Sequence, residues 1–488
     1  MTNLKTYKLL IGGHWVEGAM GTSPIINPAT ETIVGYAPEA SVEQALEAAR
    51  AARQAFPKWA ATAPEERARL LHAVSVRLQE RAADLVPLII SETGATATVG
   101  SRMQVPIAVE RFARYAKAAA KSFDIPLPPS ATLSTPLAPG GLIGAVINRQ
   151  PVGVVACISP YNFPVVNVAG KIAPALAMGC TVVIKPAPQD PLAVIELVEI
   201  MNDVGFPPGV INIITSSKPE PAAVLTETRD VDMVSFTGST AIGQRIFAAG
   251  SLTMKRLLLE LGGKGAALVF DDADIATAVG GIASVWGFHS GQICTAPTRA
   301  IVHRSKYNEL VEKLAGAARA LKVGDPTSAD TMVGPVISAL QRDRIDGYIA
   351  TGAQQGATVV VDGRRPSHME RGFYVAPTLL ADCRPDMTPV QEEIFGPVVV
   401  VLPFDDEDEA ISIANGTDFG LYDYVFSKDT ARAYRVARLL RSGNVGVNTA
   451  QRNPETPFGG FKLSGVGRDG GEFGLHAYTE MQSIVWPG

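Results

Sequence analysis

Cysteine is scarce in this sequence. Its 488 residues include only four cysteines, Cys157, Cys180, Cys294 and Cys383, which lie far apart with no CxxC pair and no neighbouring cluster of histidines. This spacing argues against a disulfide framework and against a structural metal site. We therefore expect a protein without a bound metal, with the cytoplasm as its default compartment.

Long apolar runs and runs of like charge are also missing. The first apolar stretch, residues 9–11, is too short for a secretory signal, and later ones such as residues 152–158 end far short of a membrane span. The 43 Lys and Arg residues are interspersed with 48 Asp and Glu residues, giving a net charge of −5. Because nucleic-acid binding normally needs a basic patch, we expect neither a nucleic-acid nor a membrane partner.

The remaining composition is that of a globular protein. Hydrophobic residues make up 47% of the chain and charged residues 19%, over a length that suggests two to four domains. Ser41 to Gln44 form a capping box, which predicts a helix to about residue 56. The sequence Thr-Ala-Pro-Glu at 62–65 is a second such signal, and it predicts a long helix that Gly94 ends.

From residue 152 onward, short β-rich runs alternate with helical segments. The first expected strands cover residues 152–158, 181–184, 231–236 and 256–261. A second series begins with a strand at 266–270, a helix at 274–291 and a strand at 299–303, after which Ser305 is expected to cap a helix. Such alternation is typical of parallel βαβ units with helices on both faces, so the expected fold class is α/β.

A glycine-containing turn follows the strand near residue 234. The sequence Val-Ser-Phe-Thr-Gly-Ser-Thr-Ala-Ile-Gly at 234–243 predicts a strand, a turn and the start of a helix. Glycines there let backbone amides approach a phosphate at the helix N-terminus. The spacing is neither GxGxxG nor a P-loop, because no lysine follows Gly243. A nucleotide site and plain strand–helix geometry both fit this turn.

Cys294 is the candidate nucleophile. It follows Gly291, which can end the preceding helix, and it lies on the turn before the next strand. A thiol on a turn is accessible to substrate, whereas an isolated cysteine is more often a small buried apolar residue. Cys157 and Cys180 lie in or beside strands and are interpreted as packing residues.

Glu260 and Asn162 are candidates for acid–base and oxyanion roles. Glu260 ends an apolar strand, where burial raises a carboxyl pKa toward that of a general base. An ion pair with Lys264 or Lys255 explains it equally well. Asn162 lies between two prolines at the end of a strand, where its amide fits either an oxyanion donor or an ordinary turn residue.

Seven short motifs occur in a characteristic order: PYNFP, VVIKPA, FTGSTAIG, LELGGK, GQICTA, EEIFGPV and PFGGFKLSGVGR. With GGHWVEG and INPATETIVGYAP near the start and GEFGLHAYTE near the end, they cover nearly the whole chain. Together they resemble the aldehyde dehydrogenase superfamily. The resemblance implies oxidation of a small-molecule aldehyde to its carboxylic acid, with reduction of NAD or NADP.

The resemblance also implies roles for individual residues. Cys294 attacks the aldehyde to give a thiohemiacetal and then a thioester, while the Asn162 amide and the Cys294 N–H hold the oxyanion. Glu260 activates the water that hydrolyses the thioester. Lys171 and Asp469 match positions that relay protons around this base.

For the cofactor, the resemblance implies that Lys185 reaches the adenosine ribose and that Glu393 binds the nicotinamide ribose, with Phe395 packing nearby. The implied cofactor-binding set is Lys185, Pro188, Thr237, Gly238, Ser239, Gly243, Leu261, Glu393 and Phe395. Many NAD-preferring relatives carry a Glu where this chain has Pro188. The choice between NAD and NADP therefore stays open.

For the substrate tunnel, the resemblance implies that Phe163 and Phe458 line its wall, although an ordinary core role has equal weight. Relatives commonly carry a large aromatic residue at the position of Gly170. Glycine there predicts a wider tunnel that admits an aromatic or bulky aldehyde.

The implied architecture has three parts. A doubly wound Rossmann-like cofactor domain covers residues 1–128 and 152–262, and an α/β catalytic domain covers residues 263–463. A small β element, residues 129–151 and 464–488, is expected to form a homodimer or homotetramer. The Pro-, Ser- and Gly-rich residues 124–150 independently predict an extended excursion outside the core.

Three alternatives compete with this function. A cysteine hydrolase or esterase needs a partner histidine, and His289, the one nearest Cys294, is expected at the surface. An acylating dehydrogenase passes the acyl group to coenzyme A, whereas Glu260 argues for water. A non-catalytic scaffold of the same fold has no reason to keep Cys294, Glu260 and Asn162 together.

Overall fold

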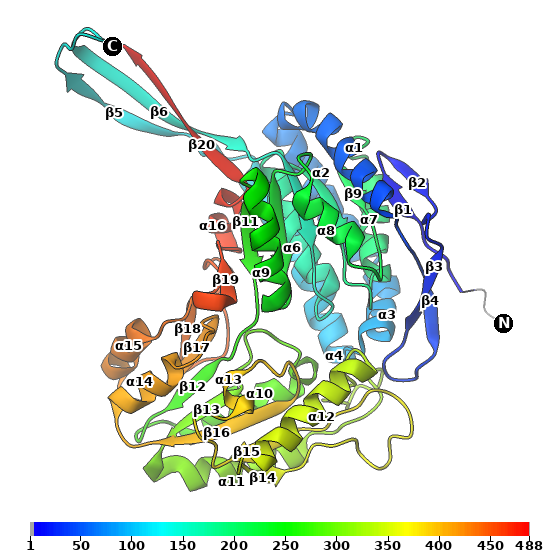
Figure 1. The fold of residues 1–488 in the computed structure, drawn as a ribbon, viewed down its shortest axis with the longest axis vertical. Helices are drawn as coiled ribbons and strands as arrows, with labels where there is room; N and C mark the ends of the chain where they lie inside the picture. Colours follow the sequence, from blue (N-terminus) through cyan, green and yellow to red (C-terminus); the bar gives the residue numbers. More distant parts are fainter. Residues whose placement is uncertain (1–3, 488) are drawn as a thin grey trace.

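The computed structural model describes residues 4–487 and contains two large sheets and a projecting arm (Figure 1). Residues 1–3 and 488, at the ends of the first and last predicted segments, lie outside the described residues. Two parts, each a sheet with its helices, meet at their edges. In residues 4–487, no helix has the length and apolarity needed to cross a membrane.

The first sheet has eight strands and a parallel centre. The order is β19-β11-β10-β7-β8-β9-β1-β2, with only β19, β1 and β2 antiparallel to their neighbours. Their bounds are β1 (Leu9–Ile11), β2 (His14–Val16), β7 (Val154–Ile158), β8 (Thr181–Lys185), β9 (Ile211–Ile213), β10 (Met233–Thr237), β11 (Arg256–Glu260) and β19 (Gly465–Val466). The strand order reverses between β7 and β10, which makes this edge the expected place for a ligand.

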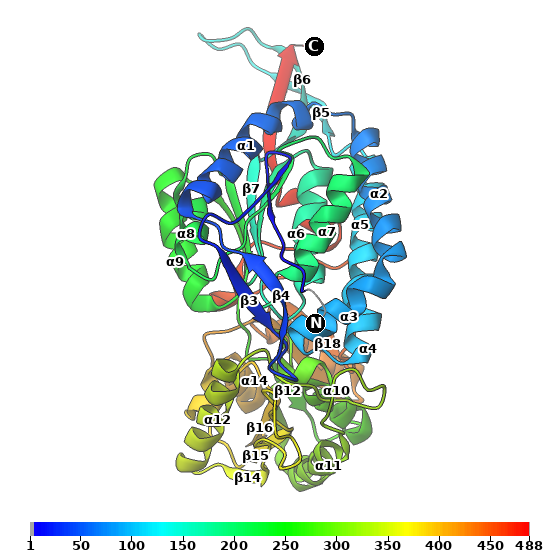
Figure 2. The same ribbon diagram turned by 90° about the vertical axis from the view of Figure 1, so that its right-hand side faces the viewer.

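Helices cover both faces of this sheet (Figure 2). One face carries α1 (Val42–Ala60), α8 (Glu220–Glu227) and α9 (Thr240–Gly250), and the other carries α2 (Pro64–Glu80), α3 (Ala82–Thr93), α5 (Val105–Ala119), α6 (Pro164–Ala177) and α7 (Leu192–Val204). Alternate residues of β7 point to opposite layers: Val155 packs with α6 and α7, and Ala156 packs with α1. This arrangement confirms the expected doubly wound α/β fold.

The helix signals near the N-terminus are partly confirmed. Ser41 caps α1 in a full capping box with Gln44, and Gly94 ends α3 in the left-handed conformation with φ of 72°. The second capping box is wrong. Because Pro64 occupies the first helical position, the cap falls on Ala63, which offers no side-chain acceptor, and the expected long helix breaks into α2 and α3 at Arg81.

The second sheet has seven strands in the order β14-β15-β16-β13-β12-β17-β18, all parallel except β14. The strands are β12 (Ala266–Val269), β13 (Arg299–His303), β14 (Thr358–Val361), β15 (Thr378–Ala381), β16 (Val398–Phe404), β17 (Tyr422–Phe426) and β18 (Asn444–Val447). Two helices pack on one face, α10 (Ile275–Gly287) and α11 (Tyr307–Ala320). The other face carries α12 (Ala339–Gln354), α13 (Thr388–Gln391), α14 (Glu407–Asn415) and α15 (Thr430–Leu439).

Two predictions for this second part are wrong in detail. The helix expected at 274–291 ends at Gly287, and His289–Gly291 forms a separate 3-10 turn. Ser305 does not cap α11, because that helix begins at Tyr307 after a 3-10 turn. The Ser305 N–H instead donates to the ring of His303.

The arm is a three-stranded antiparallel sheet in the order β20-β6-β5, which extends away from both parts (Figure 1). It contains β5 (Ile125–Thr132), β6 (Gly141–Pro151) and β20 (Thr479–Pro487), so the expected extended excursion is confirmed. Along the chain, the segment that follows the last strand of the second sheet returns to the first sheet as β19. It then forms α16 (Gly471–His476) before it enters the arm. A short hairpin of β3 (Thr22–Ile26) and β4 (Ile33–Pro38), and the single turn α4 (Ala97–Val99), complete the fold.

Candidate active site

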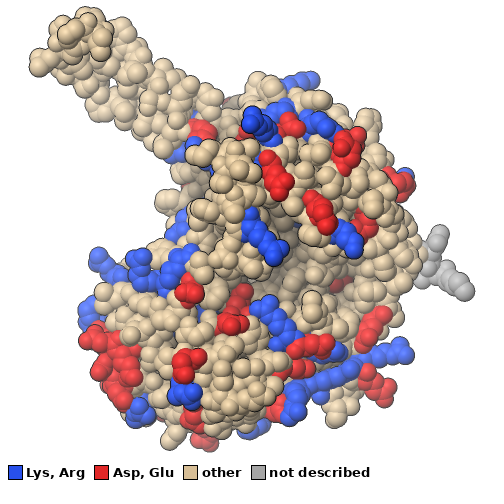
Figure 3. Space-filling model, in the orientation of Figure 1, with Lys and Arg blue, Asp and Glu red and all other residues tan. Residues whose placement is uncertain are grey.

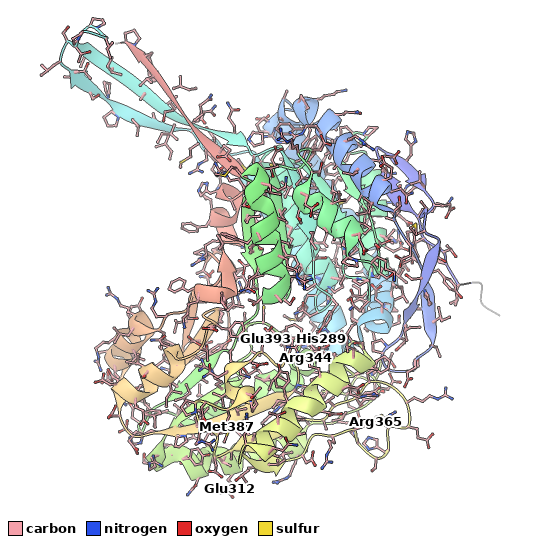
Figure 4. All side chains as sticks on the ribbon, viewed as in Figure 1. His289, Glu312, Arg344, Arg365, Met387 and Glu393 are labelled. Carbon is pink, nitrogen blue, oxygen red and sulfur yellow. The ribbon has the colours of Figure 1, made fainter. Side chains whose placement is uncertain are left out.

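The candidate residues gather where the two parts meet. Asn162 follows β7, and Glu260 is the last residue of β11, both at the carboxyl edge of the first sheet. Cys294 and Glu393 instead precede β13 and β16, at the amino edge of the second sheet. Figure 4 shows Glu393 at this junction, and the surface in Figure 3 is hollowed between the two parts. The rule that ligands bind at the carboxyl ends of parallel strands therefore accounts for Asn162 and Glu260, and it does not account for Cys294 and Glu393.

Cys294 lies on a turn that is held rigidly from both sides. His289, Ser290 and Gly291 all have positive φ, and a side chain at Gly291 would overlap the carbonyl of Gly396. The Gln292 side chain accepts from the Ile337 N–H at 3.0 Å and donates to the His289 carbonyl at 3.3 Å. The backbone before the thiol is therefore fixed by packing and by hydrogen bonds.

The Cys294 thiol is partly buried. Burial raises its pKa to about 12, and the carboxyl groups of Glu393 and Glu260 act in the same direction. The thiol is therefore protonated at neutral pH and needs a base or a nearby positive charge to become a nucleophile.

Asn162 is anchored to the Cys294 turn. Its Nδ2 donates to the Gln292 carbonyl at 2.8 Å, while its Oδ1 accepts from the Phe163 N–H at 3.0 Å and from Asn167 Nδ2 at 3.3 Å. These bonds orient the amide with its donor toward the turn. One Nδ2 hydrogen remains for a further acceptor beside Cys294.

Glu260 is buried without a partner. Its side chain is 3% exposed, and neither carboxyl oxygen has a hydrogen-bond partner within residues 4–487. Burial, followed by the charge of Asp469, holds its pKa well above the usual value. The alternative of an ion pair does not hold, because Lys255 donates to backbone carbonyls and the buried Lys264 Nζ has no partner in that range.

Lys171 and Asp469 lie beside Glu260. Lys171 is 1% exposed; burial lowers its pKa, while Asp469 and Glu260 oppose this shift. Its Nζ donates to Ser235 Oγ at 3.4 Å, and that hydroxyl lies 3.0 Å from the Tyr478 hydroxyl. Sequence reasoning missed Ser235 and Tyr478. The available signal was a serine inside an apolar strand.

The carboxyl edge of the first sheet offers groups that fit a dinucleotide. Lys185 ends β8 in a buried position, where burial lowers its pKa to about 8, and the nearby Pro188 brings no charge. Thr237 ends β10, and the exposed Ser239 precedes α9 without a side-chain cap bond. The first amides of α9 are therefore free to bind an anion.

The two glycines of this turn have a packing reason. A Cβ at Gly243 would lie 2.5 Å from Cδ2 of Leu261, and one at Gly238 would overlap the ring of Phe236. Neither residue has a positive φ. Gly243 thus lets α9 lie close to Leu261, the residue after β11. This packing is sufficient to explain why a glycine is present, whether or not a nucleotide binds here.

Glu393 holds the segment that links the two sheets. Its Oε1 accepts from the Gly263 N–H at 2.9 Å, and burial raises its pKa. Phe395 adopts a positive φ of 57°, and its ring meets Tyr161 edge-on with centroids 5.8 Å apart. Both residues therefore face the loops that leave the first sheet.

Phe163 and Phe458, the two aromatic residues expected to line the substrate tunnel, come from different parts of the chain, one before Cys294 and one after it. Phe163 precedes α6, and its ring contacts Phe288 and His289 with centroids at 5.7 and 5.3 Å. His289 is buried with no hydrogen-bond partner for either ring nitrogen in residues 4–487, so the expected surface position is wrong. A histidine in this state is not paired with the thiol, which argues against a Cys–His hydrolase.

The space expected beside Gly170 is not open. A Cβ at this residue would overlap Nη1 of Arg111, so an arginine side chain from α5 fills the volume. The wider tunnel at this point stays a prediction, because it requires the flexible Arg111 side chain to move aside. Phe458 in turn lies 3.9 Å, measured to its ring centroid, from the guanidinium carbon of Arg452. Sequence reasoning missed both arginines.

Comparisons with known proteins agree with this geometry. The family model described as "Aldehyde dehydrogenase family" matches residues 15–484. A chloroplastic betaine aldehyde dehydrogenase of Beta vulgaris is 39% identical over 98% of this chain and 96% of its own, and a 3-succinoylsemialdehyde-pyridine dehydrogenase of Pseudomonas sp is 37% identical over 97% of each. The crystal structure of betaine aldehyde dehydrogenase from Staphylococcus aureus in complex with NAD+ has a TM-score of 0.93 and 36% identity, covering 98% of this chain and 94% of that one. The chain belongs to the aldehyde dehydrogenase family.

Proposed function

We propose that this NAD(P)-dependent aldehyde dehydrogenase oxidises its aldehyde through a thioester on Cys294. The observation that carries the proposal is the buried, unpartnered carboxyl group of Glu260 beside a partly buried thiol. Burial moves the pKa of Glu260 upward, toward the range in which a general base works. A purely structural carboxylate would be paired.

The proposed reaction begins when the Cys294 sulfur attacks the carbonyl carbon and its proton passes to Glu260. Nδ2 of Asn162 and the N–H of Cys294 donate to the oxygen, which gains negative charge in the thiohemiacetal. The bound cofactor supplies the hydride acceptor. Collapse of the thiohemiacetal leaves a thioester on Cys294.

Water then releases the acid. Glu260 first gives up the proton that it took from the thiol, and it then takes a proton from water. The hydroxyl attacks the thioester carbon, the C–S bond breaks, and the leaving thiolate takes this second proton from Glu260 to restore the thiol. Asp469 and Lys171 are proposed to pass the released proton outward, since both lie close to Glu260. The balance is aldehyde, oxidised cofactor and water to acid, reduced cofactor and a proton.

We assign the cofactor to the carboxyl edge of the first sheet. Lys185 would bind the adenosine ribose, the amides that follow Ser239 would bind the pyrophosphate, and Glu393 would bind the nicotinamide ribose beside Phe395. NAD+ is bound in the Staphylococcus aureus relative. Pro188 has no carboxylate to repel a 2′-phosphate, which supports use of NADP as well.

The proposed division of labour gives residues 1–128 and 152–262 to the cofactor and residues 263–463 to catalysis. The arm is assigned to oligomerisation, with β20 as its C-terminal strand. The cytoplasm is the proposed compartment, because all four cysteines are free thiols.

The test is an assay of an aldehyde panel with NAD or NADP, with and without coenzyme A, followed by reduced-cofactor absorbance. Cys294→Ala should abolish oxidation and keep cofactor binding, whereas Cys383→Ala, which removes a buried thiol that no step of this reaction uses, should retain activity. Glu260→Gln should release a burst of reduced cofactor and then turn over slowly.

Each alternative has its own outcome. A requirement for coenzyme A would indicate the acylating branch, and ester cleavage without cofactor reduction would indicate a hydrolase. Inactivity toward every aldehyde and ester would favour the scaffold. Wild-type turnover by Glu260→Gln would remove this residue from the mechanism.

A further inference from the structure

Two arginines beside the candidate active site form no ion pair within residues 4–487, although the carboxyl group of Asp469 lies near both. Neither Arg111 of α5 nor Arg452, after β18, forms an ion pair within 4.0 Å among residues 4–487. Arg114, one turn along α5 from Arg111, behaves differently and pairs with Glu110 and with Glu455. Arg111 is half-buried and Arg452 is exposed, and a guanidinium group without an ion-pair partner is free to bind an anion.

The position of Arg111 depends on a glycine. Its Nη1 donates to the Val166 carbonyl at 2.8 Å and occupies the place that a side chain at Gly170 would need. The same Cβ position at Gly170 lies 3.6 Å from Oδ2 of Asp469, so the guanidinium of Arg111 lies next to this candidate relay residue. Gly170 therefore leaves room for the guanidinium group of Arg111.

Arg452 lies over an aromatic ring near the thiol. Its guanidinium carbon is 3.9 Å from the ring centroid of Phe458, within cation–π range. Phe458 in turn pairs with Asp469, which also lies beside Arg111, and a Cβ at Gly459 would lie 2.9 Å from Oε1 of Glu260. Both arginines therefore lie around Asp469, near the proposed base. Two guanidinium groups around one carboxyl group carry a net positive charge, which favours an anion at this place.

We infer that the aldehyde carries a carboxylate at its far end, which Arg111 and Arg452 bind while the aldehyde carbon reaches Cys294. This inference rests on the proposed function and names its substrate class. A guanidinium group binds a carboxylate through paired hydrogen bonds, and two such groups place it with high specificity. Phe458 would contact the apolar body of the molecule between the two ends.

Substrate charge tests the inference in the wild-type enzyme. We would compare 4-formylbenzoate with its methyl ester, and 5-oxopentanoate with pentanal and 4-aminobutanal. The carboxylates should have a KM at least tenfold lower than their neutral counterparts, and the aminoaldehyde should be the poorest substrate. High salt should reduce the preference for the carboxylates, since it screens the charges.

Variants locate the effect. Arg452→Gln should raise KM for the carboxylates by about 10- to 100-fold, with kcat and the KM for neutral aldehydes within about threefold of wild type. Arg452→Lys should recover part of the loss. Arg114→Gln should leave the ratio of the two KM values unchanged, because Arg114 is already paired. Arg111→Gln should resemble Arg452→Gln.

The failure of this inference is separable from that of the proposed function. If neutral and cationic aldehydes are oxidised as well as the carboxylates, the enzyme is a dehydrogenase and the substrate class is wrong. An equal loss of activity toward all aldehydes in Arg452→Gln also contradicts the inference, and it indicates a structural role. The wild-type comparison decides the matter even if a variant does not fold. Inactivity toward the whole series contradicts the proposed function itself.

Discussion

At the scale of single residues, ionisation of Glu260 is the costliest event in the site. A buried carboxyl group without a hydrogen-bond donor is stable only when protonated, and the neighbouring Asp469 adds to the cost of a negative charge. The burial that makes Glu260 a stronger base therefore also lowers the stability of the folded protein at high pH. Lys171 and Arg468 limit this cost without removing it.

This trade gives a prediction for stability against pH. The folded pKa of Glu260 lies above its ordinary value of 4.5, so its favourable contribution is complete below that pH and is lost as the pH rises toward the folded pKa. The Glu260→Gln variant has no titrating group at this position. Its free energy of unfolding should therefore rise relative to that of the wild type as the pH is raised from 5 to 8, by up to about 1.4 kcal/mol per pH unit.

Denaturant unfolding at several pH values measures this difference. The exposed Glu47→Gln in α1 is the matched control, and its difference from wild type should change little over the same range. A constant difference between Glu260→Gln and the wild type would mean that Glu260 is not destabilised as a carboxylate.

Sequence reasoning located some residues of the site and missed others for a physical reason. Cys294, Glu260 and Asn162 each lie at a strand end or turn that the local pattern predicts, so their neighbourhood follows from the α/β topology. Arg111 reaches Gly170 only through packing of α5 on α6, and Arg452 comes from a loop far along the chain. No local spacing encodes such contacts.

At the scale of elements, the contact between α9 and Leu261 sets where the free amides of this helix point. The glycine at position 243 allows that contact, since a methyl group there would lie 2.5 Å from Leu261 Cδ2. An alanine in a helix is otherwise favourable by up to about 1 kcal/mol over glycine. The sign of the stability change in Gly243→Ala therefore reports which effect is larger.

We predict that Gly243→Ala lowers stability and raises KM for NAD by about tenfold, because the Leu261 side chain or α9 itself must shift to make room for the methyl group. Combining it with Leu261→Ala should reverse the stability change, with a coupling of about 0.5–3 kcal/mol in a double-mutant cycle. Gly280→Ala in α10 is the control, because nothing lies within 4 Å of a Cβ there, and it should stabilise. Thermal unfolding and cofactor kinetics measure both quantities, and a more stable Gly243→Ala with unchanged KM would contradict the packing argument.

The elements also show how far sequence patterns extend. The capping box of α1 and the left-handed end at Gly94 are local hydrogen-bond geometries, and both were predictable. The start of α2 shifted because Pro64 takes the first helical position, and α10 ended early because the Cys294 turn packs against Gly396. Proline position was readable in advance, whereas a contact with a loop 105 residues away was not.

At the scale of the whole molecule, the site exists only because two sheets meet with opposite edges. The carboxyl edge of one supplies Asn162 and Glu260, and the amino edge of the other supplies Cys294 and Glu393. Neither sheet alone holds both the base and the nucleophile. The hydrogen bond from Asn162 to Gln292 joins the two parts at the site itself, and the one from Gly263 to Glu393 holds the segment that links the two sheets.

The arm has no such support from the rest of the chain. Every residue of β5 is exposed, and the tip carries Leu133 and Leu137 at 91% and 97% exposure. Its three strands contain only Arg149 and Glu480 as charged residues, and Figure 3 shows the arm almost without charge. A thin sheet with apolar side chains on its surface is not stable in water by itself, which favours its burial against another copy of the chain.

This argument predicts that changes on the arm alter the assembly and leave each active site in place. Leu133→Glu combined with Leu137→Glu should lower the mass measured by light scattering from that of a dimer or tetramer to a smaller species, because charge cannot be buried in the contact. Leu340→Glu is the control: it is 82% exposed on α12, away from the arm, and the mass should not change. A wild-type chain that is monomeric at micromolar concentration would contradict the assignment of the arm. An unchanged mass in the double variant would place the contact on β20 or on another face.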